Sequence, residues 1–358
     1  MKPPLSYSLP AYQPDGYGNV HRHLDNLKEL GFTWVTFTPT WLVYDEIPMR
    51  IDPARGPAFA SIRDAVGYAS SLGMRVKMEP HLDWETTLTG GPYEWRRRMY
   101  FPPDGRYADE ILAPLLEIPL QALTLGSELD VSLVEFSNSW RTALSRVPGA
   151  LSAGHKINHD SLGTAGVIRD VLNAERRKYR VPEASPSYYA GKVAGMGGYL
   201  QSLAYVSFSF YPDMRSGKDD KWWRQPTGAT HVELLASAFR NKAMQLASDL
   251  RRRAGADAKF AIGEFGLGCA DPSRPYDFTA QTFLNPDGSM NEGAREMRRK
   301  YYLSFLECLR RSPELFETHP VSFWTVTHFD FLGALEQPGS EIFRDEALRA
   351  AVAEYNAG

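Results

Sequence analysis

The sequence is short of cysteine and of long apolar stretches, and both absences narrow the kinds of protein it can encode. Only Cys269 and Cys308 occur among 358 residues, so no disulfide framework is expected. No run approaches the roughly 20 apolar residues that cross a bilayer, and the N-terminal stretch lacks the apolar core of a secretory signal. We therefore expect no membrane partner and favour the cytoplasm, with secretion left open if a signal has been removed.

An excess of charge of one sign is also missing. The chain has 40 Lys and Arg against 43 Asp and Glu, a formal net charge of -3. This balance provides no electrostatic reason to expect nucleic acid as a partner. Aromatic residues are the one excess, with 8 Trp, 18 Tyr and 18 Phe, many of them beside Gly, Pro or Asp. Aromatic side chains on loops suit a sugar-binding cleft, because pyranose rings present apolar C–H faces that stack on flat groups.

Short apolar runs alternate with amphipathic stretches along the whole chain. Helical periodicity marks the ranges 17–31, 59–73, 231–255 and 291–311. The runs typical of strands, including two weaker ones, are 5–9, 32–38, 75–79, 120–126, 149–157, 204–210, 259–265 and 321–327. No linker or internal repeat interrupts the series. The pattern predicts an α/β fold: one domain over 1–358, a single (β/α)8 TIM barrel with long βα loops on its C-terminal rim.

Two glutamates stand within two residues of a glycine at the ends of predicted strands. Glu128 follows the run 120–126 in "TLGSELD", and Glu264 lies at the end of another apolar run in "AIGEFGLG". Only a closed barrel would bring the ends of strands four and seven together. Two carboxylates facing one gap can cleave a glycosidic bond, since one protonates the leaving oxygen while the other attacks the anomeric carbon. A single strand-end glutamate is more often a solvated charge, but two with glycines close by favour a catalytic pair.

Polar and aromatic side chains near the other strand ends predict a rim that binds hydroxyl-rich ligands. The candidate substrate-binding residues are Trp41, Lys77, His81, Asp83, Trp84, Asn158, His159, Tyr211 and Trp324. Most of them also have a structural interpretation: Tyr211 and Trp324 as core residues, His159 as a buried imidazole. Glu79 is expected to pair with Lys77 or a neighbour and to influence a catalytic pKa by its charge.

At these residues the sequence resembles the clan-A (β/α)8 glycoside hydrolases, and most of all glycoside hydrolase family 113, a β-mannanase family. The segments that carry the resemblance are "DAVGYASSLGMRVKMEPHLDW", "LTLGSELD", "AIGEFGLG" and "YVSFSFYP". In the first of them, His81 and Asp83 would bind substrate hydroxyls. Glu79 departs from the pattern, because a basic residue is expected before the Pro-His pair.

The resemblance implies a retaining hydrolase of β-linked hexosides, with β-mannan or manno-oligosaccharide as substrate. In that double-displacement reaction Glu128 would be the acid/base and Glu264 the nucleophile. Tyr211 would hydrogen-bond the nucleophile, and Trp324 would stack under the sugar at the cleavage point. The chemistry requires no metal and no organic cofactor. The sequence sets neither the hexose, nor endo against exo action, nor an oligomeric state.

Two alternatives remain beside this reading. A metal-dependent barrel hydrolase would draw its ligands from His81, Asp83, His155, His159 and Glu264. Against it, no His-x-His pair ends the first strand, and the histidines lack tight ligand spacing. The second alternative is an inactive barrel that keeps the sugar cleft and binds without turnover. Metal analysis distinguishes a metal-dependent hydrolase from a glycosidase. Release of product from a sugar substrate distinguishes an active glycosidase from an inactive barrel.

Overall fold

The structure is a computed structural model of the chain, and every structural statement below refers to the residues that it describes. These residues are 2–44, 50–51, 53–79, 81–84, 128–132, 154–158, 206–212, 228–271, 280–316, 319–324, 330–335 and 339–358.

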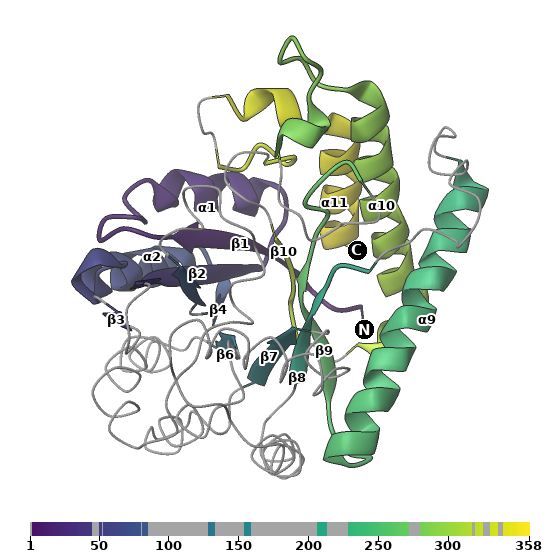
Figure 1. Ribbon diagram of the computed structural model, residues 1–358, viewed down its shortest axis with the longest axis horizontal. Coiled ribbons are helices and arrows are strands. Elements are labelled where there is room, and N and C mark those ends of the chain that lie inside the picture. The colour runs from purple at the N-terminus through teal and green to yellow at the C-terminus, as the bar shows by residue number, and fades with distance from the viewer. Residues whose placement is uncertain are drawn as a thin grey trace, which may run out of the picture.

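Parallel strands form a curled sheet whose pairings return to their starting point. The strands are β1 (Leu5–Ala11), β2 (Trp34–Tyr44), β4 (Arg75–Met78), β6 (Glu128–Ser132), β7 (Gly154–Asn158), β8 (Val206–Phe210), β9 (Phe260–Phe265) and β10 (Val321–Phe323). Their hydrogen-bonded order is β1-β10-β9-β8-β7-β6-β4-β2, and β2 also pairs with β1 in parallel. The protein is therefore an α/β barrel, as the sequence predicts (Figure 1).

Helices follow the strands in the order that a βα repeat requires. They are α1 (Val20–Glu29), α2 (Phe59–Ser71), α9 (Ala229–Ala254), α10 (Glu292–Arg311) and α11 (Glu346–Ala357). Gly31 and Gly73, at φ 77° and 71°, end the first two at the predicted positions, where an αL conformation favours glycine. No helix in the described ranges is long and apolar enough to cross a membrane. The predicted long rim loops are 83–110, 211–228 and 269–290; the residues 85–110, 213–227 and 272–279 of these loops, and the segments after β6 and β7, lie outside the described residues.

Three elements differ from the sequence prediction. Strand β2 runs past residue 38 to Tyr44, because its outer half pairs with two short strands, β3 (Arg50–Ile51) and β5 (His81–Trp84). Strand β6 begins at Glu128, so this residue opens a strand instead of following one. The run 120–126, where the sequence places the fourth strand, lies outside the described residues. Helix α11 is absent from the prediction.

Residues of β1, β2 and β10 alternate between a polar interior and an apolar outer face. Inside the barrel, Thr36 Oγ1 lies 2.7 Å from Ser6 Oγ and 2.5 Å from Ser322 Oγ, joining three strands through hydroxyl groups. Outside it, aromatic rings pack between sheet and helices. Phe265 of β9 stacks on Phe305 of α10 with ring centroids 3.6 Å apart. An interior of small hydroxyl side chains differs from the bulky branched filling that is typical of these barrels.

The two ends of the described chain lie side by side (Figure 1). The Tyr355 hydroxyl in α11 donates to the carbonyl oxygen of Pro3 at 2.8 Å, and the Lys2 ammonium donates to the Tyr355 carbonyl. Asn356 also donates to the carbonyl of Leu30, at the end of α1, at 3.0 Å. Helix α11 therefore ties the last strand–helix unit to the first.

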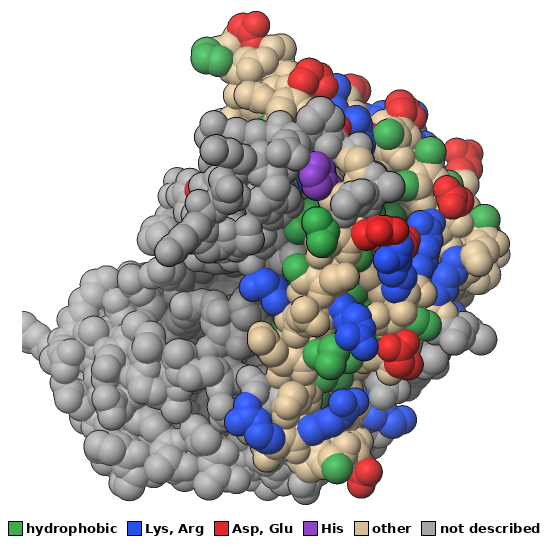
Figure 2. Space-filling model, turned by 90° about the vertical axis from the view of Figure 1, so that its right-hand side faces the viewer, with side chains coloured by type: hydrophobic (Ala, Val, Ile, Leu, Met, Phe, Trp, Pro, Cys, Tyr) green, Lys and Arg blue, Asp and Glu red, His purple; other side chains and the backbone are tan. Residues whose placement is uncertain are grey.

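On another side of the molecule, basic side chains are spread over the face that includes α9 (Figure 2).

Candidate active site

Glu264 is a buried carboxylate near the C-terminal end of β9. Every residue of this strand is buried, and Glu264 is 4% exposed. The neighbouring strand β8 pairs Ser209 with Glu264, and Tyr211 follows directly after that strand. The Tyr211 hydroxyl donates a hydrogen bond to Glu264 Oε1, the contact that the family resemblance implies. A hydrogen bond from a phenol to a carboxylate stabilises the ionised form of the carboxylate.

The register between β8 and β9 shifts immediately before Glu264. Phe208 pairs with Ile262, but the next residue of β8, Ser209, pairs with Glu264, so Gly263 is passed over. This is a β-bulge, with one extra residue in β9. Bulges next to active sites redirect the side chain that follows them. The bulge thus sets the direction in which Glu264 leaves the strand.

Lys77 lies inside the barrel and reaches the bulge. It belongs to β4, yet its Nζ donates to the carbonyl oxygen of Gly263 at 2.9 Å. Its Nζ also lies 3.3 Å from Glu79 Oε2, the pairing that the sequence predicts. Both side chains are enclosed, at 1% exposure for Lys77 and 0% for Glu79. An ion pair this deep needs its hydrogen bonds to offset the cost of removing two charges from water.

Gly266 allows two aromatic residues to approach the strand end. A Cβ at this position would lie 2.9 Å from Cε1 of Tyr211 and 3.0 Å from the carbonyl oxygen of Trp324. Trp324 follows β10, is 4% exposed, and donates its backbone N–H to Phe265 at 2.8 Å. Burial raises the pKa of Tyr302, whose hydroxyl also lies near Gly266, so this phenol stays protonated. The segment after Glu264 is therefore packed too closely for a larger residue.

Trp41 occupies a different position from the other candidates. It lies in the outer half of β2, opposite Leu82 of β5. Its ring packs against Gly56, where a Cβ would lie 2.0 Å from Trp41 Cδ1, and the side chain is 1% exposed. Its indole N–H has no hydrogen-bond partner among the described residues. As a substrate-binding residue Trp41 remains a prediction.

The structure gives backbone positions for most of the other predicted site residues. Glu128 opens β6, with its Cα opposite that of Lys77 in β4. His81, Asp83 and Trp84 lie in β5, and Asn158 is the last residue of β7. The side chains of these residues, and the whole of His159, lie outside what the structure describes.

The described side chains offer no grouping for a metal ion. Among them, no three His, Cys, Asp or Glu residues come together in a way that could hold one. Cys269 and Cys308 are both buried, and the structure joins neither to another described cysteine. The residues proposed as ligands in the metal-dependent alternative, apart from Glu264, have side chains outside the described set.

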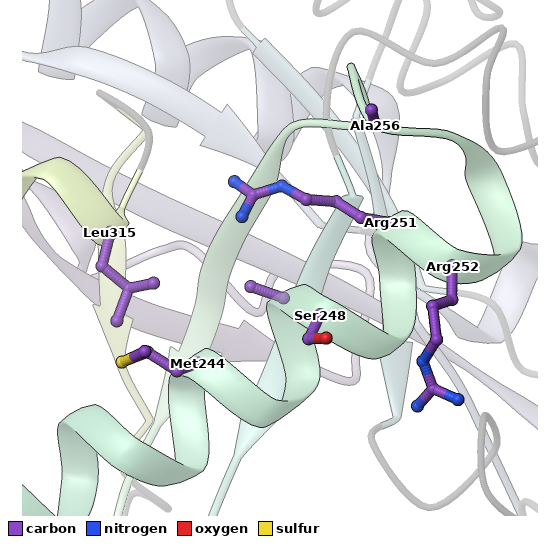
Figure 3. A pocket seen from close by; sticks show the side chains of 7 residues that line it. Met244, Ser248, Arg251, Arg252, Ala256 and Leu315 are labelled. Atoms are coloured by element: carbon purple, nitrogen blue, oxygen red, sulfur yellow. The ribbon is translucent and has the colours of Figure 1, made fainter.

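A separate pocket lies at the opposite end of the barrel from Glu264. It has a volume of about 480 Å³ and is lined by the C-terminal half of α9, including Met244, Arg251 and Arg252, together with Ala256 and Leu315 (Figure 3). Ala256 lies in the turn that precedes β9, so the pocket sits where strands begin. Barrel enzymes place their chemistry at the C-terminal ends of strands. This pocket is therefore distinct from the site around Glu264.

Two parts of the site were not assigned by sequence reasoning. The bulge at Gly263 and the close packing at Gly266 became visible only with the strand register and the neighbouring rings in place. The signal was the glycine on either side of "EF" in "GEFG", since isolated glycines in a strand pattern suggest bulges or close approach.

Comparison with known proteins bears on the fold. No family model and no curated protein sequence matches the chain. Among solved structures, the chain is similar to a complex of a β-1,4-mannanase of glycoside hydrolase family 113, with 13% identity over 100% of both chains and a TM-score of 0.59. It is also similar to the family 113 β-mannanase of Alicyclobacillus acidocaldarius, at 14% identity over 100% of this chain and 97% of that one, with a TM-score of 0.56.

A third similar structure is a family 5 xyloglucanase from Paenibacillus pabuli, at 11% identity over 99% of this chain and 98% of that one, with a TM-score of 0.50. At such identities the likeness concerns the path of the backbone. The architecture that the sequence resemblance implies is thus confirmed: this chain shares an α/β-barrel fold with these glycoside hydrolase structures, family 113 mannanases among them.

Proposed function

We propose that the protein is a retaining glycoside hydrolase that cleaves β-linked hexosides, with β-mannan or manno-oligosaccharides as its substrate class. Residues 1–358 form one catalytic (β/α)8 domain in this proposal. Glu264 is the nucleophile and Glu128 is the general acid and base. The observation that carries the proposal is the buried Glu264 carboxylate at a strand's C-terminal end, held by the Tyr211 hydroxyl.

The surroundings of Glu264 suit a nucleophile. A carboxylate that attacks an anomeric carbon must be ionised and must point in one direction. The Tyr211 hydroxyl supports the first requirement and the bulge at Gly263 supports the second. Burial at 4% exposure keeps competing water away, which strengthens the electrostatic interactions of the carboxylate.

The backbone position of Glu128 is consistent with the partner role. Its Cα pairs with that of Lys77, and the Lys77 ammonium reaches the carbonyl that precedes Glu264. One side chain thus connects the two glutamate-bearing parts of the barrel. A retaining mechanism calls for carboxyl groups about 5–5.5 Å apart, and we expect this separation between Glu128 and Glu264.

The reaction proceeds in two displacements. Glu264 attacks the anomeric carbon while Glu128 gives its proton to the leaving glycosidic oxygen, and a covalent glycosyl-enzyme forms. Glu128, now ionised, takes a proton from an incoming water molecule. The oxygen of that water attacks the anomeric carbon and releases Glu264 as a carboxylate. The sugar keeps its original anomeric configuration.

The substrate class rests on the sequence motifs and on the structural likeness to mannanases. A xyloglucanase shares the same architecture, so the fold alone does not select mannose over other sugars. Trp324, whose backbone N–H bonds to Phe265 next to the nucleophile, is the proposed stacking surface for the sugar. The remaining predicted sugar contacts come from His81, Asp83, Trp84, Asn158 and His159.

The test is a product analysis over a panel of β-linked manno-, gluco-, galacto- and xylo-oligosaccharides. We expect the wild-type protein to release shorter products from the manno-oligosaccharides, and the Glu264→Gln and Glu128→Gln proteins to be inactive while keeping their fold. Hydrolysis by cleanly prepared E264Q protein at the wild-type rate would reject the assignment. Binding of a panel sugar by the wild-type protein without product release would favour the inactive sugar-binding barrel.

A further inference from the structure

We propose that Lys77, held in place by Glu79, is a positioning residue that fixes Glu264 relative to Glu128, and that it does not contact the sugar. The inference rests on the proposed function, because it assigns a task to two buried charges beside the same two glutamates. It also changes the interpretation of Lys77, which the sequence places among the substrate-binding residues.

The direction of the Lys77 side chain is the first argument. In the order of the sheet, three strands separate β4 from β9 on either side, so the two strands lie opposite each other. The Lys77 Nζ nevertheless lies 2.9 Å from the Gly263 carbonyl oxygen of β9. The lysine therefore crosses the interior of the barrel, whereas the strand-to-strand hydrogen bonds join only neighbours.

The point of contact on β9 is the second argument. Gly263 is the residue passed over by the β8–β9 register, so its peptide departs from the regular pairing of the strand. An ammonium group that holds this carbonyl fixes the peptide plane directly before Glu264. Turning that peptide would turn the Glu264 side chain with it.

The third argument is the enclosure of the pair. Lys77 is 1% exposed and Glu79 is 0% exposed, with Nζ and Oε2 3.3 Å apart. A lysine that binds substrate hydroxyls needs an open face, but this ammonium is directed at a backbone carbonyl and a buried carboxylate. Glu79 balances the charge of Lys77. The hydrogen bond from Lys77 to Gly263 therefore crosses the barrel interior without adding a net charge there.

These contacts make Lys77 a strut between the two glutamates. Its Cα is paired with the Cα of Glu128, and its Nζ holds the residue before Glu264. The separation of the two carboxyl groups decides how a glycosidase works. Loss of the strut should therefore slow the chemical step and leave ground-state sugar binding unchanged.

The experiment compares four proteins on the panel substrate that the wild type cleaves fastest. They are the wild type, Lys77→Met, the double variant Lys77→Met with Glu79→Met, and Lys300→Met. Lys300 is the matched control, because it is a buried lysine on the outer helix α10. The measurements are kcat, KM and the melting temperature of each protein.

We expect Lys77→Met to lower kcat by about 10- to 100-fold with KM unchanged, the size of effect that misplacing a reacting group produces. It should also lower the melting temperature, because Glu79 is left buried without its cation. The double variant is the deciding protein. It should regain stability, since two apolar side chains replace the ion pair, while its kcat stays low. Lys300→Met should keep the wild-type kcat.

Three results would overturn the inference. Recovery of kcat in the double variant would mean that Lys77 only neutralises Glu79. A raised KM with wild-type kcat in Lys77→Met would return Lys77 to the substrate-binding residues. A wild-type kcat and KM in Lys77→Met would show that no strut is needed. Each differs from failure of the proposed function, which would appear as turnover by E264Q protein in the same assay.

Discussion

Removal of the Tyr211 hydroxyl tests the contact on which the proposed nucleophile depends. This hydroxyl donates to Glu264 Oε1, and the proposed mechanism requires Glu264 to be ionised in the free enzyme. The charge disappears when Glu264 bonds to the sugar, and it returns when water displaces the sugar. The hydrogen bond is therefore weakest in the covalent intermediate. Tyr211→Phe should slow the second step, in which the carboxylate charge is regained.

The magnitude follows from the strength of one hydrogen bond to a charged group, about 1.5–3 kcal/mol. At about 1.36 kcal/mol for each tenfold change in rate, the second step should slow by up to about 10- to 150-fold. Because the intermediate then accumulates, KM should fall together with kcat. Loss of substrate binding would raise KM instead.

The assay is a stopped-flow measurement with a β-mannoside that carries a dinitrophenyl leaving group. A good leaving group makes the first step fast, so Tyr211→Phe should release about one dinitrophenol per enzyme in an initial burst. Tyr355→Phe is the matched control, since its hydroxyl donates to the Pro3 carbonyl at 2.8 Å, far from the site. It should lose about 1 kcal/mol of stability and no activity. Wild-type kinetics without a burst in Tyr211→Phe would refute the reasoning.

Three further predictions concern stability and packing. Lys77→Met should lower the free energy of unfolding by about 3–5 kcal/mol in urea titrations, because Glu79 keeps a buried, uncompensated charge; an unchanged midpoint would contradict this. Burial raises the pKa of Asp330, so its contribution to stability is present at low pH and is lost as pH rises through that pKa. Asp330→Asn should remove this pH dependence and cost about 1–3 kcal/mol, because its NH2 group cannot accept the backbone N–H that one carboxylate oxygen now accepts at 2.6 Å; parallel stability–pH curves would argue against it. Gly266→Ala should cost about 1–3 kcal/mol and reduce activity, because the new methyl group would lie 2.9 Å from Tyr211, and thermal melts with activity assays will show whether it does.

Local patterns in the sequence were enough to predict the α/β barrel. Helices α1 and α2 were predicted to end at Gly31 and Gly73, and both glycines have the positive φ that such a cap uses. Strand β9 was predicted within a residue of its bounds, because "KFAIGEF" is an apolar run apart from Lys259 and Glu264. In these segments, hydrophobic periodicity and the glycines that end helices determine the structure without help from distant residues.

Elements whose limits depend on pairing were harder to predict. Strand β2 extends to Tyr44 because β5 hydrogen-bonds to its outer half. The sequence of β2 alone does not predict this pairing. Helix α11 does carry local signals: Asp345 caps it by accepting from Leu348 N–H at 3.0 Å, and Leu348, Val352 and Tyr355 form its buried face at helical spacing.

In the candidate site, too, some contacts could be expected from the sequence and others depend on long-range pairing. The resemblance to family 113 implies that Tyr211 hydrogen-bonds Glu264, and this hydrogen bond is present. The bond from Lys77 to Gly263 joins residues that are 186 positions apart. It depends on a one-residue register shift, which the sequence shows only as a glycine. Such long-range backbone contacts follow from barrel closure and cannot be deduced from local pattern.

The most direct test of the account is to trap the glycosyl-enzyme. A 2-deoxy-2-fluoro-β-mannosyl fluoride combines a slowed second step with a good leaving group, so the covalent intermediate should persist long enough for peptide mapping by mass spectrometry. The account predicts one sugar per protein, attached to the peptide that carries Glu264 and absent from E264Q protein. A label on another carboxylate, such as Glu128 or Glu79, would contradict it.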